Sequence, residues 1–126
     1  MDIYRELILD HYKHPRNFGH LEKPDVVIEE GNVTCGDKIS IELQYETTHN
    51  KCQIKDIKFL GEGCAISQAA ASMLTEKVKG QSVDFVHALH TQDILAMLGT
   101  TLAPSRIACA TLSLEVLQKA FAQIDK

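Results

Sequence analysis

The spacing of hydrophobic residues changes part-way along the chain, and this change limits the fold more than any other feature. Between residues 39 and 46, hydrophobic residues occupy every second position, which predicts a strand with one buried face. From Ile66 onward, hydrophobic residues recur at helical spacing. Strands in the first half and helices afterwards predict an α+β fold, with helices packed on a three-stranded antiparallel sheet.

The sheet is expected to contain one short strand and a hairpin. The expected strands span residues 26–28, 39–46 and 52–60, with a turn at 47–50. Within the third strand, Ile54 and Ile57 lie in opposite phases of the alternation. This shift predicts a β-bulge near Lys55 and Asp56.

Five helices are expected. They span residues 2–14, 66 to about 79, two short segments within 83–89 and 94–98, and 104 to about 124. Pro15 and Gly80 end the first two. The first helix is expected to dock through Tyr4, Leu7, Ile8 and His11. The last is expected to turn Thr111, Glu115, Gln118 and Lys119 toward water.

Length and composition restrict the class of protein. The 126 residues suit one domain, residues 1–126. A net charge of −4 argues against a nucleic-acid partner, since a phosphate-backbone binder usually carries a basic excess. No secretion signal or apolar run of ~20 residues occurs, so we expect no membrane association and a cytoplasmic location. There the four cysteines stay reduced and available to metal or sulfur chemistry.

Two cysteines lie beside glycine in settings that suit metal binding. Cys35, Gly36 and Asp37 follow one another, and in extended backbone the first and third side chains point the same way and can share one ion. Taken alone, this triplet is more typical of a turn than of a metal site, because glycine and aspartate favour turns. Cys64 follows Gly63 at the expected start of a helix, where the dipole suits a thiolate, although a small residue in a tight loop fits as well.

The other cysteines and the histidines are less informative on their own. Cys109 shares a helical face with apolar residues and looks like core, and Cys52 lies in a strand with no glycine or acid beside it. The cysteine spacing lacks the paired C-x-x-C of zinc ribbons and the signature of zinc deaminases. His11 belongs to a docking face, His49 lies in a turn, and His87 and His90 have no matching acid or thiol in their region, so we interpret the histidines as surface or core residues.

Several further motifs are Asp10-His11-Tyr12, Pro15-Arg16-Asn17, residues 31–37, Gly63-Cys64 with the Ser/Ala-rich helix, and residues 106–112. Together they resemble one family, the iron–sulfur cluster assembly scaffolds IscU, SufU and the NifU N-terminal domain. The resemblance spans almost the whole chain and implies a SufE/NifU-like α+β domain. It also implies that Cys35, Asp37, Cys64 and Cys109 hold a [2Fe-2S] cluster, iron or zinc.

The subfamily is mixed. Gly63 to Ser67 and Arg106 to Leu112 are similar to SufU, yet the SufU-type insertion before Cys109 is missing. IscU-type scaffolds place a histidine where this chain has Ala108. Residues 102–106 also depart from the IscU chaperone-binding segment, so dependence on the dedicated chaperone pair is not implied.

The resemblance implies two functions. A scaffold would accept sulfur from a cysteine desulfurase, assemble a labile [2Fe-2S] cluster with iron and pass it to acceptor proteins. A zinc-bound sulfurtransferase would relay persulfide sulfur to another scaffold. Cys35 is the expected sulfur acceptor by resemblance to SufU, and Cys109 is the alternative by resemblance to IscU. A purely structural zinc domain is a third class.

Overall fold

A computed structural model describes residues 3–32, 36–49, 51–99, 102 and 104–124. Its elements are α1 (Ile3–Lys13), β1 (Val26–Asn32), β2 (Asp37–Thr48), β3 (Lys51–Glu62), α2 (Ala65–Val78), α3 (Val83–His87), α4 (Thr91–Leu98) and α5 (Pro104–Ile124). The expected order of elements is confirmed, although each strand is longer than expected. No helix among the described residues is both long enough and apolar enough to cross a membrane.

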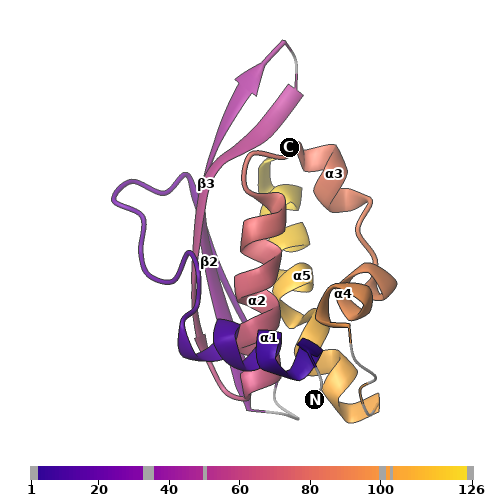
Figure 1. The fold of residues 1–126 in the computed structure, drawn as a ribbon. Coiled ribbons are helices and arrows are strands. Elements are labelled where there is room, and N and C mark those ends of the chain that lie inside the picture. The colour runs from indigo at the N-terminus through magenta and orange to yellow at the C-terminus, as the bar shows by residue number, and fades with distance from the viewer. Residues whose placement is uncertain (1–2, 33–35, 50, 100–101, 103, 125–126) are drawn as a thin grey trace.

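The sheet is antiparallel with the order β1-β2-β3, and the helices lie on one side of it (Figure 1). The predicted bulge is confirmed. Tyr45 pairs with Ile54 while Gln44 pairs with Asp56, so Lys55 is the extra residue. The bulge brings the hydrophobic residues on both sides of it onto the same inner face.

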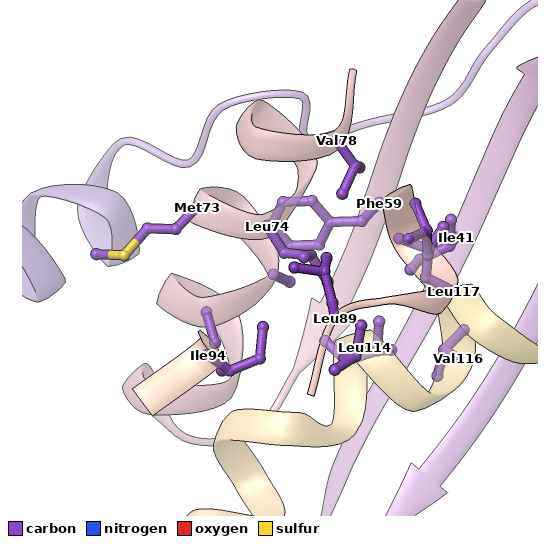
Figure 2. Close-up of a cluster of buried hydrophobic side chains, with 14 of the residues drawn as sticks. Ile41, Phe59, Met73, Leu74, Val78, Leu89, Ile94, Leu114, Val116 and Leu117 are labelled. Carbon is purple, nitrogen blue, oxygen red and sulfur yellow. The ribbon is translucent and has the colours of Figure 1, made fainter. Parts of the chain in front are cut away.

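The core lies between this inner face and two long helices. Ile39, Ile41 and Leu43 of β2 are fully buried, as the alternating pattern predicts. Figure 2 shows Ile41 and Phe59 of the sheet gathered with Leu74 and Val78 of α2 and Leu117 of α5. Because α2 and α5 both pack on the sheet, their first turns reach the same end of the molecule as the start of β2 (Figure 1).

Polar side chains connect α1 to α2. The Ser72 oxygen of α2 accepts the Arg16 N–H at 2.9 Å and lies 2.7 Å from Nδ1 of His11. The side-chain Nδ2 of Asn17 donates to the hydroxyl of Thr75, also on α2, at 3.1 Å. These bonds hold the segment after α1 against α2.

That segment then follows the outer edge of β3. The Phe59 N–H donates to the Asn17 carbonyl at 2.8 Å, and the Gly19 N–H donates to the Phe59 carbonyl at 2.9 Å. Further along β3, the Ile54 N–H donates to the Gln81 carbonyl at 2.9 Å. Two stretches of backbone therefore pair with the β3 edge.

Two expectations about helix faces are wrong. Leu7 is 38% exposed, because it lies at the margin of a face that is centred on Ile8 and His11. Thr111 is buried rather than wet, because its hydroxyl donates to the Ile107 carbonyl at 3.1 Å and so needs no water. Glu115 and Lys119 are exposed as expected, whereas Gln118 is half-buried. The side chain of Tyr4 lies outside the described part.

Candidate metal centre

Three of the four expected ligands meet at one end of the sheet. Asp37 begins β2, Cys64 precedes α2, and Cys109 lies in the second turn of α5. One carboxylate oxygen and the two sulfurs lie within 4.8 Å of one another. In a tetrahedral zinc site with bonds of ~2.3 Å, ligand atoms are ~3.8 Å apart. A small inward movement would therefore bring these three atoms around one ion.

The Asp37 carboxylate is almost fully buried, and the backbone beside Cys64 holds it in place. Its Oδ1 accepts the N–H of Cys64 at 2.8 Å, and the Cys64 thiol lies 3.7 Å from Oδ2. The register explains this contact. Because Lys38 pairs with Glu62, the residue before Lys38 faces the turn that follows Glu62.

Gly63 makes the close approach of Asp37 sterically possible. Its φ is +121°, a backbone conformation that residues with a side chain rarely adopt. A β-carbon at this position would lie 1.9 Å from Oδ1 of Asp37, far inside van der Waals contact. The glycine expected from the motif is therefore needed for space as well as for backbone conformation.

Cys64 is the N-cap of α2, but its side chain does not cap the helix. Its carbonyl accepts the hydroxyl of Ser67 at 3.2 Å and the N–H of Gln68 at 3.3 Å, which fixes the backbone. The sulfur of Cys64 therefore contacts the Asp37 carboxylate and does not accept a hydrogen bond from the helix N–H groups. The thiol is half-buried and directed toward the other ligands.

Cys109 is fully buried in α5. Its local setting among apolar residues is the one expected of a core cysteine, and the same placement brings its sulfur to Asp37 and Cys64. The spacing along α5 could not reveal this, because the other two ligands come from distant parts of the chain.

Arg106 is a charged neighbour that analysis of single residues missed. Its side chain is exposed one helical turn before Cys109. The pKa of its guanidinium is raised, first by the charge of Cys64, next by a hydrogen bond to Cys64, and then by a hydrogen bond to Cys109. The only sequence signal was the i, i+3 spacing from a cysteine, together with the motif of residues 106–112.

Cys35, Cys52 and the histidines were the other residues considered as ligands. Cys35 lies outside the described residues, so its role as a ligand stays a prediction. Cys52 is half-buried, packs against the hydrophobic core and does not belong to the cluster, as expected. Among the described residues, no histidine joins the cluster. Two thiols and a carboxylate form a mixed soft and hard donor set that suits zinc or iron.

Comparison with known proteins identifies relatives over nearly the full sequence. The family model described as the NifU-like N terminal domain matches residues 3–126. The zinc-dependent sulfurtransferase SufU of Bacillus subtilis is 36% identical, and the match covers 96% of this chain and 90% of SufU. The iron–sulfur cluster assembly scaffold protein IscU of Aquifex aeolicus is 38% identical, over 93% of this chain and 73% of IscU.

A solved structure supports the fold. The crystal structure of an iron–sulfur cluster assembly scaffold protein of the SUF system from Fervidobacterium islandicum superposes with a TM-score of 0.78. The match covers 91% of this chain and 93% of that chain, at 24% identity. At that identity the likeness concerns the fold alone, and it confirms the expected SufE/NifU-like arrangement.

Proposed function

Because the chain belongs to the NifU-like N-terminal domain family, we propose that it is an iron–sulfur cluster assembly scaffold. In this function it accepts sulfur from a cysteine desulfurase, an external electron donor reduces that sulfur to sulfide, and the sulfide combines with iron as a labile [2Fe-2S] cluster that is transferred to acceptor proteins. The observation that carries the proposal is the convergence of Asp37, Cys64 and Cys109 within 4.8 Å. We further propose that it works in the cytoplasm, where thiols stay reduced.

The composition of the site suits temporary binding. We assign Cys35 as the fourth ligand beside Asp37, Cys64 and Cys109. Thiolates bind iron through soft sulfur, whereas a carboxylate is a harder and weaker ligand for the same centre. A site with one weak ligand releases its cargo more readily than a site of four cysteines. The buried carboxylate of Asp37 would provide that weak position.

A second candidate function is supported by a specific observation. The chain covers 90% of a relative that is a zinc-dependent sulfurtransferase, at 36% identity. The same four residues could hold one zinc ion, which keeps thiolates together until a partner displaces one of them. In that function the protein relays persulfide sulfur to another scaffold and builds no cluster.

Both functions need a cysteine that receives sulfur, and we assign this role to Cys35. The acceptor thiolate attacks the outer sulfur of the desulfurase persulfide, a new S–S bond forms, the old one breaks, and the desulfurase thiolate leaves. The attacking thiolate must approach the outer sulfur in line with the S–S bond that breaks, so it must be accessible to the desulfurase. Cys109 is fully buried within α5, which disfavours the alternative acceptor. Gly36, with a φ of +70° and open space around it, follows Cys35 directly.

One pair of measurements separates the two functions. Metal analysis of anaerobically purified protein gives the iron, sulfide and zinc content, and the visible spectrum shows whether a [2Fe-2S] cluster is present. After incubation with desulfurase, cysteine, ferrous iron and a thiol reductant that converts persulfide sulfur to sulfide, a scaffold would gain about one cluster and transfer it to an apo-ferredoxin. A sulfurtransferase would keep zinc and gain only sulfur. Zinc that never leaves, with no response to the desulfurase, would contradict both functions and indicate a structural zinc domain.

The sulfur acceptor is tested with single Cys→Ser variants. After reaction with desulfurase and cysteine, mass spectrometry should detect one added sulfur atom in every variant except Cys35→Ser. Cys52→Ser is the matched control and should retain both its metal and the added sulfur. Cys64→Ser should lose metal. An added sulfur that survives Cys35→Ser and disappears in Cys109→Ser would assign the role to Cys109.

A further inference from the structure

The outer face of the sheet is hollowed at the end that carries the metal centre. Within the described part of the chain, no helix lies on this face, and residues 14–25 cross part of it (Figure 1). The hollow has a volume of about 520 Å³. We call it the outer hollow, and its main lining residues are Phe18, Val27, Glu29, Lys38, Leu60 and Glu62.

One wall of the outer hollow is held by a polar clasp. The Glu42 side chain is buried on this face, where it accepts the N–H of Leu21 at 2.9 Å and bonds to the ring of His20. Next to the clasp, the Phe18 ring rests edge-on against Phe59, with ring centres 5.4 Å apart. The wall is therefore a formed surface that does not depend on a partner.

The floor of the outer hollow exposes apolar side chains. Val27 is 55% exposed and Phe18 is 44% exposed, the two highest values among the large hydrophobic residues found exposed in the described chain. Leu60, between them on the sheet, is half-buried. Apolar side chains that gather in one hollow with a polar rim are typical of a contact site for another molecule.

The rim of the outer hollow is acidic. Glu29 and Glu62 line it, with Lys38 paired to Glu29 at 3.0 Å, while Glu42 is bonded to His20 in the wall. A complementary surface would therefore be positively charged with apolar side chains between its charges.

A second hollow continues the first toward the metal centre. It has a volume of about 370 Å³, shares Glu29, Lys38 and Glu62 with the outer hollow, and adds Glu30 and Asp37. The second hollow therefore reaches Asp37, and Cys109 is not among its lining residues. It adds the carboxylates of Asp37 and of Glu30, which is paired with Lys119 at 3.1 Å.

We infer that the outer hollow is a docking site for an extended, basic and apolar segment of a protein partner. The apolar side chains of the segment would contact Phe18, Val27 and Leu60, and its cations would face Glu29 and Glu62. A segment bound in this way lies beside the metal centre and leaves the half-buried Cys64 thiol uncovered. The partner could therefore stay bound in the outer hollow while sulfur or metal is exchanged at the metal centre.

The test measures peptide binding by amide NMR, independently of sulfur or cluster chemistry. The probe is a capped hexapeptide that alternates arginine with leucine. We expect it to shift the amide signals of Val27, Ser40 and Leu60 and to bind several-fold more weakly when salt is raised from about 0.05 to 0.3 M, because exposed charges are screened. Peptides with glutamate in place of arginine, or serine in place of leucine, should bind at least fivefold more weakly.

Two protein variants and one control locate the site. Val27→Ser and Glu29→Lys should each weaken binding of the arginine–leucine peptide about fivefold, with circular dichroism spectra like that of the parent. Glu115→Lys makes the same charge change on the exposed surface of α5 and should leave binding nearly unchanged. Equal effects of Glu29→Lys and Glu115→Lys, equal binding of the arginine–serine peptide, or shifts confined to the helical side would overturn the inference.

Discussion

The carboxylate of Asp37 occupies the space where a side chain of residue 63 would begin. A β-carbon on Gly63 would lie 1.9 Å from Oδ1 and 2.8 Å from the α-carbon of Asp37, and the same Oδ1 accepts the Cys64 N–H at 2.8 Å. The turn before α2 and the start of β2 therefore fit together only when residue 63 lacks a side chain. Each change at this contact moves a candidate metal ligand.

We predict that Gly63→Ala weakens zinc binding by about 10- to 100-fold, the range seen when groups that orient ligands are disturbed. The added methyl must displace Asp37, and φ at residue 63 must also change. Competition with a chromophoric chelator measures the affinity. Gly80→Ala is the matched control, since Gly80 also has a positive φ of +84° but open space around it. The control should lose stability and keep its zinc affinity, and equal affinities in the two variants would disprove the steric argument.

The carboxylate of Asp37 is expected to control release of a reconstituted cluster. We predict that Asp37→Ala transfers its cluster to an apo-ferredoxin roughly tenfold more slowly, because exogenous thiol can replace the weak oxygen ligand and bind more firmly. Circular dichroism of the ferredoxin follows the transfer. A variant that transferred as fast as the parent would remove Asp37 from this role.

Asp37→Asn separates ligand chemistry from structure. The asparagine oxygen can still accept the Cys64 N–H, a bond that alanine loses. If charge and ligand strength govern release, both variants should be slow. Slow transfer in Asp37→Ala alone would instead indicate that the backbone of Cys64 had moved.

Arg106 is expected to strengthen metal binding through its charge. With Cys35 as the proposed fourth ligand, a zinc site of three thiolates and a carboxylate would carry excess negative charge, and the guanidinium lies beside Cys64 and Cys109. Arg106→Gln should lower zinc affinity roughly threefold, a modest effect because the side chain is exposed. Arg106→Lys should keep most of the affinity. The difference should shrink in 0.5 M salt, and a difference that is independent of salt would point to a packing effect.

His11 is expected to make stability depend on pH. Burial lowers its pKa from 6.5, Arg16 lowers it further, and Glu76 and Asp10 oppose them. Its Nε2 lies 3.6 Å from Glu76, and Ser72 faces Nδ1. The fold therefore favours the neutral ring. Stability is complete above about pH 6.5, and it falls below that value, where the unfolded chain takes up a proton first.

Urea unfolding between pH 7.5 and 5 measures this effect. The free energy of unfolding of the parent should fall relative to that of His11→Gln, by at most about 1.4 kcal/mol per pH unit. His14→Gln removes an exposed histidine of the same helix end and should preserve the pH dependence of the parent. Parallel curves for the parent and His11→Gln would show that His11 does not contribute.

Local sequence patterns predicted the helices and strands well, because the alternation of a strand and the residues that end a helix involve positions close together in the sequence. The bulge at Lys55 follows from two hydrophobic phases that must share one core. Glu42 shows where such patterns fail. It occupies a polar position of the alternation, yet it is buried, because residues 20 and 21 cross the outer face and bond to it. A period of two residues carries no information about a segment that returns from elsewhere in the chain.

Prediction of the candidate site also depended on the family resemblance, because its ligands come from distant parts of the chain. Cys109 has the surroundings of a core residue, and only the packing of α5 against the sheet brings it to Asp37. Thr111 was expected to face water because threonine is polar, but a bond to its own helix satisfies the hydroxyl. Arg106 was missed as an individual residue, because its partners are two cysteines of different elements.

Backbone pairing along β3 means that the two edges of the sheet differ in their capacity to pair with a strand of another molecule. On the β3 side, Asn17 and Gly19 bond to Phe59, and Gln81 bonds to Ile54, so an incoming strand would find these positions occupied. Within the described residues, no strand flanks β1 on its outer side. Intermolecular strand addition, the first step of β-aggregation, is therefore directed to β1. Variants that detach residues 17–19 would open a second template for aggregation even where the core is intact.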